Sequence, residues 1–524
     1  MPPLLEVVAL IAVVVVGAAA ARRFGLLAPI LLVLAGLAAS LVPGVPAVEL
    51  DPELVLVGVL PPLVYVAALE TSVPAFRFNL RPILLLAVGL VVATGLVVGF
   101  ALSAVLPGVP LAACLALGAI VAPPDAVAAT AVARRIGLPG RVVTILEGES
   151  LINDATALVM LRVSVAAAVG GATGPGRIAV EALLAAGGGI AVGAAGAVLF
   201  GFAHRRTTDP LLDNALSLLT PFAVVLVAEW LGGSGVVAVV VTGLVLGPRT
   251  PTLMSAASRL QMEAFWRMVR FLLEGLVFLL VGLQLREVLA QLHTPVGTVA
   301  AATAVVLAAV VVTRFAWLYP STYLARLMPV VRTSQPTLDL RYPTVVAWAG
   351  MRGVVTIAAA FTLPTTLAGG RAYPRDLFVW LAFAVIVVTL VLQGLTLPAV
   401  ARRLRLPPDD PRVDLLAEAA VQYQASQAAL RRLEQTADGA PPEIVEQLRG
   451  QTGRRSNGAW ERLGSQRRET PAIAYARLRR AMLDAEREVF RAARDEGRIT
   501  EQVLRRAQRD MDLEESMLKR DGAA

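Results

Sequence analysis

Chemically reactive side chains are scarce in this chain. Its 524 residues include one cysteine, Cys114, and two histidines, His204 and His293. A single cysteine excludes an intramolecular disulfide, and there is no CxxC or Cys/His spacing typical of a metal site. Both histidines fall in segments that connect apolar runs, so we expect them at the surface. The sequence therefore predicts no resident cofactor.

Charge is scarce too, and it is unevenly distributed. Only 16 % of the residues are charged and 56 % are apolar, whereas soluble domains have about 25 % charged residues. Residues 401–524 carry 24 of the 47 basic and 21 of the 39 acidic residues. We therefore expect a membrane domain over 1–400 and a cytoplasmic helical tail over 401–524. The net charge of +8 does not indicate nucleic-acid binding, because the basic residues of the first region lie between hydrophobic runs.

Long apolar runs predict an all-α polytopic membrane protein. A membrane-spanning helix needs about 20 mostly apolar residues. Arg22 and Arg23 follow the first run instead of preceding it, so this run is a span and not a secretory signal. About thirteen spans are predicted, at residues 4–20, 26–42, 53–69, 82–106, 111–133, 141–169, 178–203, 213–231, 234–248, 264–286, 295–326, 342–367 and 376–399. The first is marginal and the ninth is short, so twelve is the alternative count.

Loop charges predict the orientation. With thirteen spans and the N-terminus outside, one set of loops carries 19 arginines and the other carries 4. Lys and Arg concentrate on the cytoplasmic side of bacterial membrane proteins, so the C-terminus is predicted to be cytoplasmic and the protein to lie in the plasma membrane. In the tail, helices are expected over 415–434 and 475–517, with a flexible link over 437–470. The tail is either a solvated helix pair or a regulatory or dimer-forming element.

Two spans contain helix-breaking residues next to charges. Pro123 and Pro124 lack backbone N–H groups and must interrupt the fifth span. Such breaks persist at membrane depth only where they line a cavity or a site, and their free carbonyls can bind a cation. Asp125 follows the break, either as a helix cap or as part of a cation site. In the twelfth span, Gly350 and Gly353 flank Arg352 in the same way.

The sixth span carries the densest polar cluster. Ser150 and Asp154 are four residues apart and share one helix face, and Glu149 and Asn153 share the adjacent face. Charges at this depth usually mark ion pathways. Burial favours the neutral acid, which lets a proton compete with a hard cation such as Na⁺ for Asp154, with Ser150 as a second oxygen ligand. A permanent ion pair of Asp154 with an arginine is the alternative.

Arg352 needs a buried anion because a guanidinium stays charged. Glu149 is the leading candidate, which would make Glu149 and Arg352 a structural ion pair. The broken spans occupy corresponding places in spans 1–6 and 8–13. This arrangement predicts two inverted six-helix repeats with crossed broken helices and a site at the midplane.

Four motifs together resemble the sodium/proton antiporter family, which includes the sodium–proton exchangers and the NhaP-type proteins. They are Pro-Pro-Asp-Ala-Val at 123–127, Glu-Gly-Glu-Ser-Leu-Ile-Asn-Asp at 147–154, Phe-Leu-Leu-Val-Gly-Leu at 278–283 and Gly-Met-Arg-Gly-Val-Val at 350–355. The resemblance covers residues 1–400. It implies a homodimer, a six-helix core and elevator-like alternating access. It also implies a proton and Na⁺ competing for Asp154, and Asn153 beside Asp154 implies electroneutral exchange. The predicted cation- and proton-binding residues are Asp154, Ser150, Asn153, Asp125 and Pro124.

The chain departs from the family at two ligand positions. Pro124 stands where many members have Thr, which leaves only a backbone carbonyl, and Val66 stands where many have Glu. Glu70 lies one turn after Val66 and either replaces the missing ligand or snorkels at the span end. Glu274 in the tenth span is either an ion-pair partner or a gating residue. Selectivity among Na⁺, Li⁺ and K⁺ is left open.

Three other functional classes fit the sequence less well than exchange. A sodium-coupled solute symporter shares broken helices but needs a second, organic-solute pocket, for which there is no signature. A membrane-embedded enzyme could use Asp125 with Glu149, but no catalytic or phosphate-binding motif is present. A channel would not need a titrating acid. The sequence thus favours a transporter, and not an enzyme, that exchanges a monovalent cation for H⁺.

Overall fold

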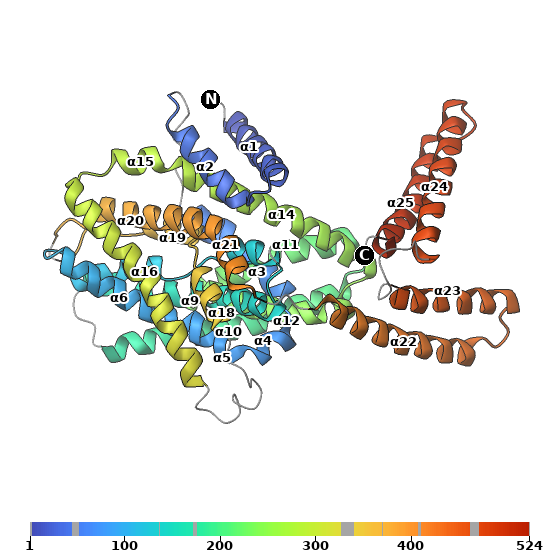
Figure 1. The fold of residues 1–524 in the computed structure, drawn as a ribbon, viewed down its shortest axis with the longest axis horizontal. Coiled ribbons are helices and arrows are strands. Elements are labelled where there is room, and N and C mark those ends of the chain that lie inside the picture. Colours follow the sequence, from blue (N-terminus) through green and yellow to red (C-terminus); the bar gives the residue numbers. More distant parts are fainter. Residues whose placement is uncertain are drawn as a thin grey trace. The chain divides into compact units, whose positions relative to one another are not determined.

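The computed structural model describes residues 3–43, 52–135, 137–170, 175–325, 340–368, 370–406, 410–461 and 471–522 (Figure 1). Over these residues the chain is helical apart from turns, loops and one isolated bridge between Thr366 and Ala372. Contacts divide it into two compact units, Met1–Pro408 and Asp409–Ala524. The all-α prediction is confirmed.

The first unit contains the predicted spans. Its helices are α1 (Pro3–Phe24), α2 (Ala28–Ser40), η1 (Leu54–Val59), α3 (Leu60–Glu70), α4 (Val73–Phe78), α5 (Leu80–Leu84), η2 (Leu85–Leu90), α6 (Val91–Val105), α7 (Leu111–Val121), α8 (Ala126–Arg135), α9 (Gly140–Gly170), α10 (Pro175–Arg206), α11 (Pro210–Trp230), α12 (Gly235–Leu246), η3 (Gly247–Arg249), α13 (Thr250–Leu253), α14 (Ala256–Leu283), α15 (Leu285–Ala290), α16 (Val296–Ala325), α18 (Arg341–Trp348), α19 (Val354–Phe361), α20 (Arg375–Val388), η4 (Thr389–Gln393) and α21 (Gly394–Leu404).

Each predicted span falls on a helix or on consecutive helices of this unit. Within the described residues, nine helical stretches are long and apolar enough to cross a membrane, and three shorter apolar ones lie at Ala28–Ser40, Leu54–Glu70 and Leu111–Val121. These lengths and compositions are those of a multi-pass membrane protein. The count of thirteen crossings stays a prediction.

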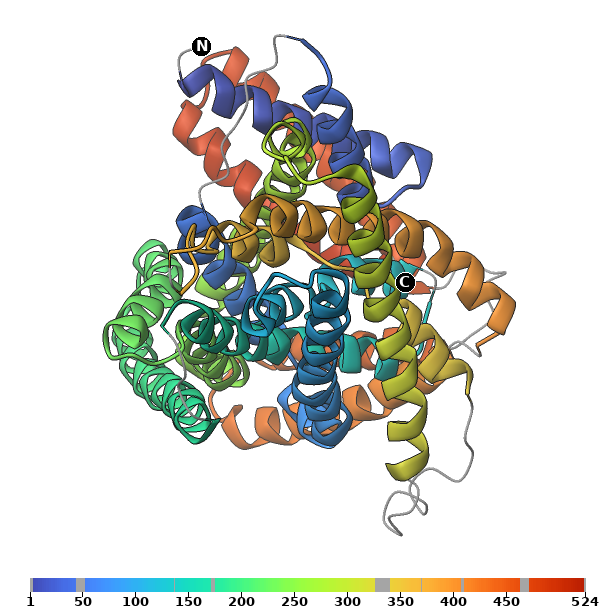
Figure 2. The same ribbon diagram turned by 90° about the vertical axis from the view of Figure 1, so that its left-hand side faces the viewer.

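The helices of the first unit pack in three groups that position the site. One group is α1, α2 and α14; a second is α10, α11 and α12 (green in Figure 2), with α12 also packed on α3. The third is α6, α7 and α9, with α16 against α6. Most side chains of α20 are buried, because this helix packs against α7, α16 and α19. In α9, which packs on α7, α8 and η2, the polar residues Glu149 and Asn153 are buried, whereas Arg162 is exposed.

The described residues of the second unit form four helices: α22 (Pro411–Thr436), α23 (Pro442–Glu461), α24 (Pro471–Asp495) and α25 (Glu501–Gly522). The prediction of a flexible link over 437–470 is wrong for α23. A proline at the first helical position starts this helix, because its missing N–H would have no partner there anyway. Residues 462–470 of the predicted link lie outside the described residues.

Candidate functional site: two broken helices around an acidic cavity

Two interrupted helices meet in the first unit. The Pro123–Pro124 pair separates α7 from α8, and the segment around Gly350 separates α18 from α19. The two breaks touch directly, because the Asp125 backbone N–H donates a 2.7 Å hydrogen bond to the Met351 carbonyl. Both predicted helix breaks are therefore present, and they meet at one point.

Arg352 closes the end of α7. Its Nε donates to the Val121 carbonyl at 2.9 Å and its Nη2 to the Ala122 carbonyl at 3.1 Å, while Nη1 bonds the Gly350 carbonyl. The last carbonyls of a helix lack intrahelical donors and carry the negative end of its dipole. Arg352 supplies both the donors and the positive charge, and it is 1 % exposed.

Gly353 lets the two breaks approach each other. A Cβ atom at this position would lie 2.6 Å from both Cβ and Cγ of Asp125, closer than such contacts occur. Only a glycine leaves room for the Asp125 side chain here. This close contact fixes where the Asp125 carboxylate enters the site.

The buried ion pair is Glu149 with Arg314, and the predicted pair of Glu149 with Arg352 is wrong. Arg314, on α16, donates from Nη1 to Oε1 of Glu149 at 2.7 Å and from Nη2 to Oε2 at 3.0 Å. Its Nε also donates to the Val346 carbonyl near the end of α18, at 3.2 Å. Arg352 thus caps α7 and Arg314 caps α18, but only Arg314 also bonds to the Glu149 carboxylate. Arg314 is 1 % exposed.

Asn153 supports the first break and does not line the cavity. Its side-chain amide donates a 2.7 Å hydrogen bond to the Pro124 carbonyl, and both residues are buried. Pro124 borders the cavity, but its carbonyl already accepts this bond. The Asn153 side-chain N–H₂ therefore supports the break, while its buried Oδ1 has no hydrogen-bond partner among the described residues.

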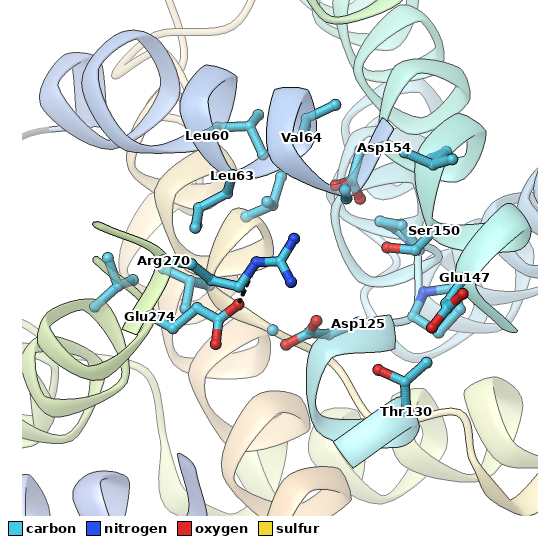
Figure 3. Close-up of a pocket in the computed structure, with 18 of the residues that line it drawn as sticks. Leu60, Leu63, Val64, Asp125, Thr130, Glu147, Ser150, Asp154, Arg270 and Glu274 are labelled. Carbon is cyan, nitrogen blue, oxygen red and sulfur yellow. Dashed lines mark ion pairs between the residues drawn. The ribbon is translucent and has the colours of Figure 1, made fainter. Parts of the chain in front are cut away.

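The other face of α9 borders a cavity of about 350 Å³. Ser150 and Asp154 lie on this face, so the two polar faces of α9 have separate surroundings, as their four-residue spacing predicts. Figure 3 shows Asp154 and Ser150 on one side of the cavity, Arg270 and Glu274 on the other, and Asp125 between them. Within the described chain, no hydrogen bond or ion pair engages the Asp154 carboxylate.

The opposite wall comes from α3 and α14. Arg270 on α14 donates a 2.9 Å hydrogen bond to the Glu70 carboxylate of α3, and its Nε lies 3.8 Å from Glu274, one turn along α14. At another edge, Arg134 pairs with Glu147 at 2.5 Å. Of the predicted accessory residues, Glu70 and Glu274 both border the cavity, and both have an arginine beside them.

His204 contradicts the prediction of a surface residue. It lies in the last turn of α10, is 3 % exposed, and its Nδ1 is 2.5 Å from the fully buried Asp213 carboxylate on α11. The short turn between α10 and α11 brings His204 and Asp213 together. In the sequence, the only indication of this pair is that Asp213 follows His204 by nine residues. His293 is exposed, as expected.

Comparison with known proteins identifies the family. The model of the transmembrane sodium/hydrogen exchanger family matches residues 9–403. The chain belongs to this family. A sodium/hydrogen exchanger of Mycobacterium tuberculosis, itself described as uncharacterized, is 37 % identical over 529 residues, covering 98 % of this chain and 96 % of the relative. The Bacillus subtilis sodium, potassium, lithium and rubidium/H⁺ antiporter is 33 % identical over 387 residues, covering 71 % of this chain and 57 % of that protein.

The fold agrees with the family. The sodium/proton antiporter MjNhaP1 of Methanocaldococcus jannaschii matches with a TM-score of 0.61 at 20 % identity, over 77 % of this chain and 99 % of that one. As a sodium/hydrogen exchanger family member, the chain is a multi-pass membrane transporter that exchanges a cation for protons.

Proposed function

We propose that Asp154 is the group on which a proton and a monovalent cation alternate, with Ser150 supplying a further oxygen and Asp125 a second carboxylate. Na⁺ is the expected cation, with Li⁺ and K⁺ as further candidates, because hard cations prefer oxygen ligands and these side chains offer oxygen only. Alternating access, in which the cavity faces one side of the membrane and then the other, completes the cycle.

Two acids on α9 differ in their contacts, and this difference supports the proposal. Glu149 is held by two hydrogen bonds from Arg314, whereas Asp154 faces the cavity without an arginine partner among the described residues. Separating a carboxylate from its partner in a buried ion pair costs free energy, because it leaves an uncompensated charge in the interior. Asp154 is able to gain and lose a proton or a cation, and Glu149 is not.

Exchange is proposed to be electroneutral, one cation for one proton. Asn153 stands beside Asp154, and its amide is used to hold the Pro124 carbonyl. An amide has no proton to lose at physiological pH, so this position adds no second charge to the cycle. The homodimer implied by the family resemblance belongs to the same proposal.

Proteoliposomes with an internal pH dye test the mechanism. We expect Na⁺ to drive proton movement that persists when valinomycin and K⁺ clamp the voltage. D154N should abolish this movement, whereas E147Q, which changes the acid paired with Arg134, should keep it. Faster exchange with the clamp than without it would contradict electroneutrality, and an active D154N would refute the role of Asp154.

The proposed topology has the N-terminus outside and the second unit in the cytoplasm, in the plasma membrane, as the 19-to-4 arginine distribution predicts. Cysteine labelling tests it in a C114A background. R206C, at the end of α10, should react only from the cytoplasmic side, and R371C, in the loop before α20, only from outside. The reverse labelling pattern would show that the topology is inverted.

A further inference from the structure

Arg270 places a permanent positive charge in the wall of the cation cavity. Its guanidinium is held between two acids, 2.9 Å from Glu70 on α3 and 3.8 Å from Glu274 on α14. Figure 3 shows it reaching from α14 into the cavity, towards the side where Asp154 and Ser150 lie. A guanidinium cannot lose its proton in a protein, so this charge is present throughout a transport cycle.

Arg270 stands among mainly acidic side chains in the cavity. Among the described residues, seven ionisable side chains border it: the carboxylates of Glu70, Asp125, Glu147, Asp154 and Glu274, and the guanidiniums of Arg134 and Arg270. Arg134 is 69 % exposed and already pairs with Glu147, while Arg270 is 30 % exposed. Arg270 is therefore the more enclosed of the two positive charges at the cavity.

We propose that Arg270 acts as a resident cation of the cavity and competes with the transported cation for the electrostatic attraction of the acidic side chains. Glu70 is the positioning residue that holds the guanidinium aside. This inference rests on the proposed function and adds a determinant of cation affinity to it. When the cavity holds no cation, the guanidinium offsets part of its negative charge. The 2.9 Å hydrogen bond to Glu70 holds the guanidinium on the α3 side of the cavity, where it repels a bound cation less than a released guanidinium would.

The contacts of Glu70 favour this role over direct cation binding. Its side chain is 58 % exposed, and its carboxylate already accepts a charge-assisted hydrogen bond from Arg270. A carboxylate occupied in this way is a poor replacement for a cation ligand at Val66. Glu70 thus acts on the transported cation through Arg270.

The first test compares arginine variants on α14. Removing a unit charge at an effective dielectric near 20 changes a cation affinity by several-fold, so we expect R270Q to lower the Na⁺ concentration for half-maximal exchange about 3- to 10-fold without raising the maximal rate. R270K keeps the charge and should therefore lower the half-maximal Na⁺ concentration less than R270Q does. R267Q is the matched control, because Arg267 lies on the same helix in an exposed pair with Glu263.

A double-mutant cycle tests the role of Glu70. E70Q should raise the half-maximal Na⁺ concentration several-fold in the wild-type background, because it releases Arg270 into the cavity, and should have a much smaller effect in the R270Q background. Equal effects of E70Q in both backgrounds would show that Glu70 binds the cation independently, and would overturn its positioning role.

The outcomes separate this inference from the proposed function. If the wild type shows no cation-driven proton movement, the proposed function fails. If the wild type exchanges but R270Q has an unchanged or higher half-maximal Na⁺ concentration, the resident-cation role of Arg270 alone is refuted. Thermal unfolding of each purified variant, compared with R267Q, distinguishes a change in affinity from a loss of folded protein.

Discussion

Arg314 and Glu149 lie 165 residues apart in the chain and form a two-bond ion pair in the protein interior, with N–O distances of 2.7 and 3.0 Å. Removing one partner of a buried pair leaves an uncompensated charge. R314Q should therefore destabilise the protein by about 3–5 kcal/mol. Thermal unfolding in detergent measures this loss.

The double variant E149Q/R314Q checks the cause. It leaves no buried charge unpaired, so it should recover part of the stability that R314Q loses. R267Q breaks an exposed pair on α14, which is worth at most about 1 kcal/mol. Equal unfolding temperatures for R314Q and R267Q would contradict a structural role for the buried pair.

Gly353 should not tolerate a methyl group. An added Cβ would meet Asp125 at 2.6 Å, so G353A must push the two helix breaks apart. Overpacking of this kind costs about 1–3 kcal/mol, and we expect exchange in proteoliposomes to fall sharply as well. G297A is the control, because nothing lies within 4 Å of a Cβ at Gly297 in α16. A G353A protein with wild-type exchange would show that this contact does not position Asp125.

The two histidines should differ in their effect on stability. His204 contacts the buried Asp213, and a hydrogen bond to a charged group contributes about 1.5–3 kcal/mol. H204A should lower the unfolding temperature accordingly. H293A changes an exposed side chain and should stay within about 0.5 kcal/mol of the wild type. Similar losses for both variants would contradict a buried pair between α10 and α11.

The helical hairpin of α24 and α25 should depend on pH through Glu514. Two hydrogen bonds from Arg479 join the helices and hold the pKa of the Glu514 carboxyl below its usual range, while the same contacts raise the pKa of Arg479. A carboxyl with a lowered folded-state pKa stabilises the fold above its unfolded value of about 4.3 and loses this contribution as pH falls through the folded value.

Amide hydrogen exchange in the full-length protein measures this effect. R479Q should make the α25 amides exchange faster at pH 7, by a modest factor because these groups are near the surface. The difference from the wild type should disappear in acid. R498Q, which removes a local contact with Glu496, is the control. A difference of equal size at neutral and acid pH would rule out the Glu514 carboxylate as the cause.

Much of the site could be predicted from local sequence. Pro123 and Pro124 must interrupt a helix wherever they occur, and the four-residue spacing of Ser150 and Asp154 places them on one face of any α-helix. These rules act within a few residues, so they hold regardless of the surrounding fold. They correctly separated the cavity face of α9 from the face that carries Asn153.

The partners of the charged residues were decided only by the tertiary structure. Glu149 pairs with Arg314 and not with Arg352, because α16 passes beside the end of α18. There the Arg314 guanidinium reaches both Glu149 and the Val346 carbonyl. Glu70 and Arg270 are 200 residues apart, and His204 becomes buried only when α11 folds back on α10. Hydropathy and helix periodicity determined which segments enter the membrane and which faces are polar. Ion pairing depends on which helices become neighbours, and local pattern does not encode that choice.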